Sequence, residues 1–239
     1  MPTSGTTAFD LPIDEIVEEA FERTGMRGNR TGYQLKSARR SLNILLTEWN
    51  NRGVNLWKIK LATVPLVEGQ AQYTYANDNT NFPTDISDVL EAYVRNNTTA
   101  TAPVDTTLSK IDRSAYAGLA NKLAKGTPSQ YYVQRTVAPS IFLFQTPSSS
   151  FSGSNFQLKF FYVARIQDAG AYTNESDVVY RFIPCMTAGL SYYLSLKYSP
   201  ETVQANKLIY EDEFKRALDE DCQRTSTFIT PQTFYGDWV

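Results

Sequence analysis

The hydrophobic period of this chain changes twice, from helical to strand-like and back, and no other feature limits its possible folds as strongly. Between residues 11 and 24 the apolar positions recur at helical spacing, and residues 33–52 carry a second helical stripe. The apolar positions of the two stripes are Ile13, Ile16, Val17, Ala20, Phe21, Leu35, Ala38, Leu42, Leu45, Leu46 and Trp49. Gly53 is the expected cap of the second helix, because glycine readily adopts the left-handed conformation found there.

The middle of the chain alternates apolar and polar residues, which is the period of a β-strand. In residues 56–64 the apolar Trp57, Ile59 and Leu61 alternate with Lys58 and Lys60, and this predicts a half-buried strand with the odd positions on its apolar side. Turn-forming residues separate this segment from the next ones. Further strands are expected at 71–75, 86–96, 104–109, 129–136, 140–146 and 155–166, and a short helix at 112–124.

The helical period returns after residue 168. A helix that begins at about 177 or 181 and ends at 198 is apolar on most sides, which predicts that it lies at the centre of a bundle. A last helix starts near Pro200 and ends near 224–225. Its apolar face consists of Val203, Tyr210, Phe214, Ala217 and Leu218.

These segments predict an α+β fold in which both ends of the chain build one helical bundle and an antiparallel β-rich domain is inserted between them. Pro231 and Gly236 favour an extended arm over another helix at the C-terminal end. The expected division is a bundle from residues 1–55 and 170–226, a β-rich domain from 56–169 and an extended arm from 227–239.

Composition argues against several functions. The chain has 23 lysines and arginines against 25 aspartates and glutamates, so there is no broad basic field for tight, general nucleic-acid binding. It has no histidine, the commonest general base and zinc ligand. Cys185 and Cys222 lie far apart, which argues against a disulfide scaffold or a structural zinc site. Because no phosphate-binding loop or nucleophile elbow occurs either, we predict no enzyme activity, catalytic residue, metal or cofactor.

Two charged groups are candidates for contact with a partner. A cationic cluster lies opposite the leucine stripe of the second helix, and its charge suits DNA phosphates, a carboxylate-rich subunit surface or simple solvation. It consists of Lys36, Arg39 and Arg40. An acidic run on the last helix is solvated surface unless it lines a channel, where it would repel passing DNA. Its candidate channel-facing residues are Glu211, Asp212, Asp219 and Glu220.

The C-terminal residues 228–239 are rich in aromatic side chains, although chain ends are usually unstructured unless something holds them. Aromatic rings anchor protein interfaces at low entropic cost. This segment is therefore expected either to fold back on its own subunit or to dock on a partner. The anchors are Phe228, Phe234, Tyr235 and Trp238.

The stretch ARRSLNILLTEWNNRGVNLWKI, residues 38–59, resembles the early helix and first strand of the head-to-tail adaptor proteins of tailed phages, the family that includes tail tubular protein A. Four later segments resemble the same family: GTPSQYY (126–132), IFLFQTP (141–147), FYVARIQD (161–168) and MTAGLSYYLSLKY (186–198). We interpret the family-like positions as fold determinants. They are Leu42, Leu45, Trp49, Gly53, Trp57, Gly126, Pro128, Tyr131, Tyr132, Gly189, Leu190 and Tyr193.

The resemblance implies a non-enzymatic virion protein at the head–tail junction, made in the host cytoplasm. It implies a ring, commonly of twelve subunits, that joins the portal to the tail nozzle or tail tube. Genome DNA would pass through the middle during ejection without sequence-specific binding. In that family the C-terminal extension reaches the portal, so the aromatic anchors are expected to dock on the portal or on a neighbouring subunit. No membrane partner is expected, because the most apolar run, 182–196, is shorter than a bilayer span.

Two alternatives stay open on the sequence. A tail-associated carbohydrate-active enzyme would use a carboxylate pair from the β-rich part, for which Asp85 and Asp88 are the candidates. A β-rich receptor or sugar-binding module would instead bind glycans as a monomer. Ring formation with a portal protein distinguishes the adaptor from both.

Overall fold

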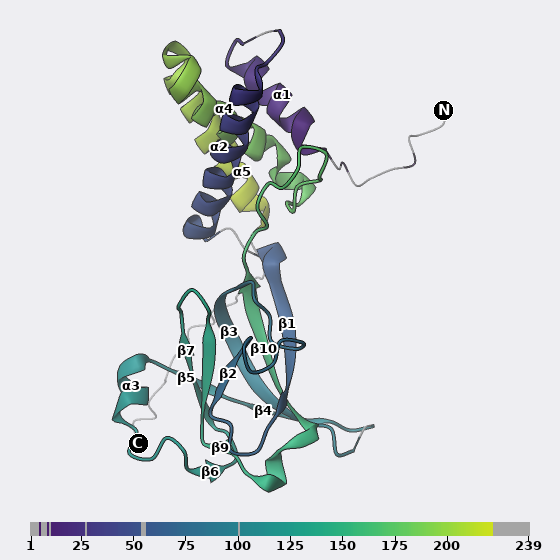
Figure 1. Ribbon diagram of the computed structural model, residues 1–239, viewed down its shortest axis with the longest axis vertical. Coiled ribbons are helices and arrows are strands. Elements are labelled where there is room, and N and C mark those ends of the chain that lie inside the picture. Colours follow the sequence, from purple (N-terminus) through teal and green to yellow (C-terminus); the bar gives the residue numbers. More distant parts are fainter. Residues whose placement is uncertain are drawn as a thin grey trace, which may run out of the picture.

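The computed structural model describes residues 5, 9, 11–26, 28–53, 56–99 and 101–221. The longer helices are gathered at one end, and the sheets lie at the other end together with the short helix α3 (Arg113–Gly118) (Figure 1). The longer helices are α1 (Ile13–Arg23), α2 (Gly32–Arg52), α4 (Ile183–Tyr198) and α5 (Val203–Asp221). The short helical elements are α3 (Arg113–Gly118), η1 (Leu56–Lys58), η2 (Ser149–Phe151), η3 (Tyr180–Phe182) and η4 (Pro200–Thr202). The α+β fold class is confirmed, whereas the predicted arm at 227–239 lies outside the described residues.

The strands lie between α2 and η3 in the chain. They are β1 (Ile59–Leu66), β2 (Gln72–Thr74), β3 (Ile86–Asn96), β4 (Val104–Thr107), β5 (Ser109–Ile111), β6 (Lys125–Gly126), β7 (Gln130–Gln134), β8 (Ser140–Phe144), β9 (Thr146–Pro147) and β10 (Gly153–Ala164). We call these strands together the β unit, and α1, α2, α4 and α5 the bundle.

Both N-terminal helices form where the apolar period predicts them. A capping box opens α2: the Thr31 hydroxyl accepts the Gln34 N–H at 3.3 Å, and Gln34 Oε1 accepts the Thr31 N–H at 2.8 Å. This exchange satisfies backbone donors that the first turn of a helix leaves unpaired. Gly53 ends the helix with a φ of 79°, which confirms the predicted cap.

The central helix of the bundle is α4, as its apolar sequence predicts. It packs against α1, α2 and α5, and Pro184 fits its first turn because the missing N–H leaves no hydrogen bond unmade there. Gly189 allows close packing, since a Cβ at this position would lie 2.8 Å from Leu45 Cδ1 and 2.9 Å from Tyr210 Cε2. Neither α4 nor any other helix in the described ranges combines the length and apolarity needed to cross a membrane.

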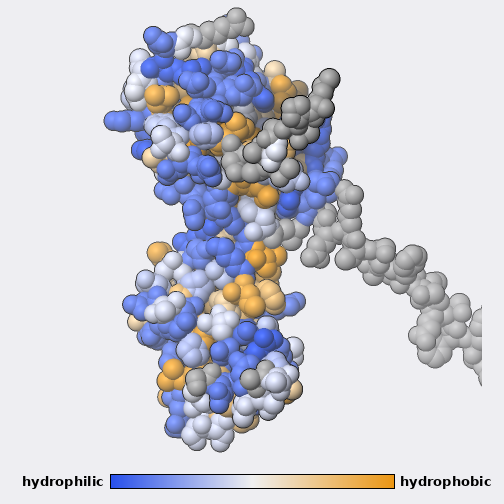
Figure 2. Space-filling model, turned by 90° about the vertical axis from the view of Figure 1, so that its right-hand side faces the viewer, coloured by the Kyte–Doolittle hydropathy of each residue, from blue (hydrophilic) through white to orange (hydrophobic). Residues whose placement is uncertain are grey.

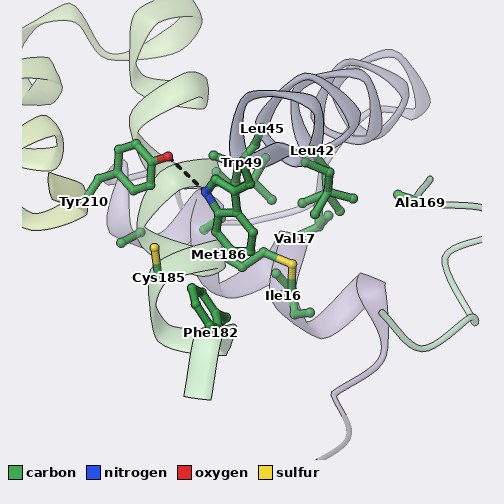
Figure 3. Packing of buried hydrophobic residues seen from close by; sticks show 14 of the residues in the cluster. Ile16, Val17, Leu42, Leu45, Trp49, Ala169, Phe182, Cys185, Met186 and Tyr210 are labelled. Carbon is green, nitrogen blue, oxygen red and sulfur yellow. Dashed lines mark hydrogen bonds between the residues drawn. The ribbon is translucent and has the colours of Figure 1, made fainter. Parts of the chain in front are cut away.

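The helical core joins the two ends of the chain (Figure 3). Trp49 of α2 is fully buried, and its indole N–H donates to the Tyr210 hydroxyl of α5 at 3.0 Å. The predicted apolar face of α5 also meets this core. Its buried members are Tyr210, Phe214 and Ala217, and its half-buried members are Val203 and Leu218.

The described strands form two four-stranded sheets that share a second core. Their orders are β1-β10-β3-β4 and β2-β8-β7-β5, and β6 pairs with β9 in a short ladder. Pairing is antiparallel except in β5–β7 and β6–β9. The Tyr131 hydroxyl of β7 bridges the two sheets by donating to the Leu90 carbonyl of β3 at 3.2 Å. The β unit therefore has its own apolar interior between two sheets.

Two segments of the β unit differ from the prediction. The strand expected at 104–109 is interrupted at the buried Leu108, because the chain there passes from the first sheet into the second. The helix expected at 112–124 is shorter. Asp112 caps it by accepting the Ala115 N–H at 2.6 Å, and it ends at Gly118.

The face that β1 presents to the core was predicted wrongly. The turn η1 precedes the strand, and Leu61 on the expected apolar side is 46% exposed. The buried positions of the strand are Ala62, Val64 and Leu66. Lys58, expected on the polar side, is buried with its ammonium bound to the Asp177 carboxylate. Apolar residues lie on both faces of this strand, with Ile59 and Leu61 on one face and the three buried residues on the other. Local alternation therefore did not identify the buried face, which the pairing with β10 fixes.

The segment between β10 and η3 brings the chain back to the bundle. Asn43 Oδ1 of α2 accepts the Ala169 N–H at 2.7 Å. The chain also passes from one hydrophobic core to the other here, because Ala164 belongs to the core of the β unit and Ile166 to the helical core. The predicted domain limits at residues 55, 169 and 226 stay predictions.

Candidate interaction surfaces

The predicted cationic cluster lies on one side of α2, with Lys36 and Arg40 exposed and Arg39 half-buried. Arg39 Nη1 donates to the Gly170 carbonyl at 3.2 Å, and the guanidinium lies 5.8 Å from the centre of the Tyr172 ring. Arg39 therefore helps to hold the segment that follows β10. Lys36 and Arg40 remain at the surface, where they are accessible to a partner.

Lys197 of α4 adds a fourth cation that the sequence did not indicate. Its ammonium donates to Ser37 Oγ at 3.0 Å and to Ser41 Oγ at 2.7 Å, both on α2. Burial lowers the pKa of Lys197, and the nearby charge of Arg40 lowers it further. Within the described ranges none of these four cations forms an ion pair, so the positive charge is unbalanced. We call Lys36, Arg39, Arg40 and Lys197 the cationic patch.

The acidic candidates on α5 fall into two kinds. Glu211 accepts two hydrogen bonds from the Arg52 guanidinium of α2, at 2.9 and 3.0 Å. This hydrogen bonding lowers the pKa of the Glu211 carboxyl and raises the pKa of Arg52. Glu211 thus connects two helices of the bundle. The other candidates, which are exposed like Glu211, are Asp212, which pairs with Arg216 on the same helix, and Asp219 and Glu220.

Arg52 is the centre of a polar network that the sequence did not reveal. Its guanidinium also forms an ion pair with Glu48 and lies 4.6 Å from the centre of the Phe214 ring. Glu48 Oε2 accepts the Tyr193 hydroxyl of α4 at 2.8 Å. Burial, with this hydrogen bond, raises the pKa of Tyr193 to about 12. One arginine therefore links α2, α4 and α5 through partners far apart in the sequence.

The exposed side of α1 carries charge of the opposite sign. Its carboxylates border a shallow hollow of about 460 Å³ at the surface of the bundle. Two of them have local partners, since Glu19 binds Arg23 at 2.8 Å and Glu18 lies 3.6 Å from Arg30. We call Glu15, Glu18, Glu19 and Glu22 the acidic face.

An apolar groove lies near the start of α1, the purple helix at the right of the bundle in Figure 1. Its volume is about 530 Å³, and it is lined by Phe9, Leu11, Tyr180, Ile183 and Pro184. This side faces the viewer in Figure 2, where hydrophobic atoms are exposed among hydrophilic ones. The sequence pattern did not indicate the groove, because its lining combines residues before α1 with η3 and the first turn of α4, which meet only in the folded chain.

The two carboxylates of the enzyme alternative each have cationic neighbours. Asp85 lies 3.2 Å from the Lys60 ammonium. Asp88 lies 3.4 Å from the Lys110 ammonium and 3.6 Å from the Arg135 guanidinium. Ion pairing within the β unit accounts for both residues.

The predicted aromatic anchors lie outside the described residues, as does Cys222, so docking by these anchors stays a prediction. They are Phe228, Phe234, Tyr235 and Trp238. Cys185 is a buried free thiol, and burial raises its pKa to about 12. In the part of the chain that the structure describes, no three Cys, Asp or Glu side chains are grouped to hold a metal ion.

The described residues thus build two packed cores whose surfaces carry charged faces and an apolar groove, features that suit binding to other proteins. The comparison with protein families agrees. The family model described as SU10 adaptor protein matches residues 13–233, and the chain belongs to this family of phage adaptor proteins. No curated protein matches the chain. Membership indicates a structural component of a phage virion, and it gives no support to the carbohydrate-active or sugar-binding alternatives.

Proposed function

We propose that this protein forms a ring between the portal and the tail nozzle of a phage, with genome DNA passing through its centre. The observation that carries the proposal is the family match across residues 13–233, a range that includes every described helix and strand. The resemblance to head-to-tail adaptors such as tail tubular protein A supports the same role and implies twelve subunits. A net charge of -2 fits a channel that DNA crosses without sequence-specific binding.

Contacts between subunits are assigned to the two charged faces of the bundle. A ring closes through head-to-tail contacts, in which two different faces of each subunit meet. The cationic patch and the acidic face are such a pair, since they carry opposite charges on the same bundle. Complementary charge sets the register and speed of association more than its strength. DNA phosphates remain the second candidate ligand of the cationic patch.

The exposed acids of α5 are proposed to face the channel. Carboxylates there repel the DNA backbone and keep it from adhering during passage. Two of the four candidate acids already have cationic partners that offset part of their charge, since Glu211 pairs with Arg52 and Asp212 with Arg216. The aromatic anchors in 228–239 are proposed to dock on the portal or on a neighbouring subunit, where burial of aromatic rings supplies most of the binding free energy.

Electron microscopy of the purified protein mixed with its portal protein tests this function. Rings seated on the portal are the expected result, and protein that stays monomeric and unbound in the presence of the portal would refute it. The double variant Lys36→Glu, Arg40→Glu is expected to abolish rings, and the reversal Glu18→Lys, Glu22→Lys in the same chain is expected to restore them. Lys207→Glu is the matched control, because Lys207 is an exposed lysine of α5 outside the cationic patch.

A variant that lacks residues 228–239 separates ring formation from attachment. We expect it to fold and to keep the helical signal in circular dichroism, because α5 and the helical core end before this segment. We also expect it to lose binding to the portal. Unaltered attachment would show that the aromatic anchors have another role.

A further inference from the structure

The apolar groove leaves large hydrophobic side chains open to water. Phe9 is 70% exposed and Tyr180 is 56% exposed, and their ring centres lie 6.2 Å apart. Together with Leu11, Ile183 and Pro184 they border a continuous hollow of about 530 Å³. Contiguous apolar surface of this kind usually marks a binding site.

The last described helix ends beside this groove. α5 packs against η3, the turn that carries Tyr180. Asp221 is the last residue of α5 that the structure describes, and it is buried, with its carboxylate bound to the Arg181 guanidinium. Because Arg181 directly follows Tyr180, this ion pair fixes the point from which the chain continues next to the lining of the groove.

The sequence that follows has the composition to fill the groove. Residues 222–227, CQRTST, are polar and, when extended, span roughly 20 Å. That reach is sufficient, since Asp221 already touches the residue next to Tyr180. Residues 228–235, FITPQTFY, then supply Phe228, Ile229, Phe234 and Tyr235 without any charged residue. The segment before the groove is a poorer match, because residues 1–8, MPTSGTTA, contain no aromatic side chain.

We propose that in the free subunit residues 228–235 occupy the apolar groove of their own chain. Tethering by a short linker gives the segment a high effective concentration at the groove, so modest apolar contacts suffice to hold it. The same aromatic side chains are then withheld from other surfaces until a partner competes for them. This docking belongs to the unassembled protein and does not depend on whether a ring forms.

A photo-crosslinker at position 180 tests the docking in the full-length protein without the portal. Tyr180 is replaced by p-benzoylphenylalanine, which keeps an aromatic ring in the lining, and the products of irradiation are mapped by mass spectrometry. Cross-links within one chain to residues 228–238 are expected. The same amino acid at Tyr33 is the matched control, since Tyr33 is 70% exposed on α2 away from the groove. Cross-links to residues 1–8, cross-links between chains, or a pattern equal to that of the control would overturn the proposal.

Hydrogen exchange gives a second readout that does not rely on the crosslinker. Ile183→Asp places a charge in the groove and is expected to speed amide exchange in residues 228–235 several-fold. Leu196→Asp is the control on the same helix, because Leu196 is 50% exposed and does not line the groove. Circular dichroism of both variants verifies the fold. Equal exchange in the wild type and the Ile183 variant, with both folded, would refute docking in the groove.

Discussion

The bundle and the β unit are held together in different ways. The helical core takes residues from the N-terminal helices and from the C-terminal helices. Polar side chains connect these helices, as in the hydrogen bond between Trp49 and Tyr210, which are 161 positions apart. The core of the β unit comes from one continuous stretch, residues 62–164, whose strands are joined by backbone ladders. One region thus depends on long-range side-chain contacts, and the other closes on itself.

This difference predicts that the bundle and the β unit are not equally able to keep their structure independently of the rest of the chain. Contacts between residues far apart in sequence require closure of a long loop, which has an entropic cost before any contact is gained. The bundle must close such a loop around the whole β unit, whereas the β unit needs only shorter connections. We therefore expect the β unit to keep its structure under conditions that loosen the bundle, and single substitutions can test this.

The largest effect is expected for Trp49→Ala. It leaves a cavity in the helical core and removes the donor to the Tyr210 hydroxyl, which lowers the free energy of unfolding by about 4 kcal/mol. Denaturant titration by circular dichroism measures this loss. Hydrogen exchange in the same variant should show fast exchange in α2 and α5 while β3 and β10 stay protected. Simultaneous loss of protection in both regions would show that the chain unfolds as one unit.

Leu158→Ala tests the opposite region. Leu158 is fully buried in β10 between the two sheets, so its truncation is expected to lower the free energy of unfolding by about 3 kcal/mol. Leu61→Ala on the neighbouring strand β1 is the matched control, and with 46% of its surface exposed it should change stability by less than about 0.5 kcal/mol. Denaturant titration compares the two variants, and equal effects would contradict the observed face of β1.

Gly189→Ala probes the close packing of α4. A methyl group there would lie within 3 Å of Leu45 and Tyr210, so we expect a loss of about 2 kcal/mol from overpacking. Gly32→Ala is the control, since a Cβ in the first turn of α2 meets no atom within 4 Å, and it should stay within about 0.5 kcal/mol of the wild type. Thermal unfolding of both variants measures the difference. A Gly189 variant as stable as the wild type would mean that α4 can move away from α2 and α5 at little cost in free energy.

The sequence predicted best those elements whose period is unambiguous. Helix α2 and strand β3 lie within one residue of their expected limits, because the apolar stripe and the flanking caps or turns agree. The face of β1 was predicted wrongly, since alternation alone does not say which side meets the second sheet. The burial of Lys58 depends on Asp177, which is 119 positions away and therefore invisible to a local pattern.

The candidate surfaces were predicted less completely than the fold. The cationic charges of α2 were visible because they lie on one helix face. Lys197 was missed since only the packing of α4 on α2 brings it to the same place. The apolar groove was missed because Leu11 and Ile183 come from segments that meet only in the folded chain. Surfaces assembled from distant segments require the tertiary structure.

The smallest effect is expected for Glu211→Gln, which removes the charge that binds Arg52 across two helices. The side chain of Glu211 is 45% exposed, and Arg52 keeps Glu48 as a partner, so we expect a loss of about 0.5 kcal/mol at pH 7. Arg52 lowers the pKa of Glu211 in the folded state below its usual 4.5. The stabilisation is therefore complete above about pH 4.5 and disappears as the pH falls through the lowered pKa.

Denaturant titrations of the wild type and the Glu211 variant between pH 7 and pH 3 measure this dependence, and the two stabilities should converge at the acid end. Asp105→Asn provides the comparison in the β unit, where Arg95 likewise lowers the pKa of Asp105. That pair is about as exposed as the Glu211–Arg52 pair, but it joins β3 and β4, which a backbone ladder already holds side by side. Its loss should therefore matter less than the loss of a pair that holds two distant segments. A larger effect for Asp105 would mean that the edge of the β unit depends on its ion pair more than the junction of α2 with α5 does.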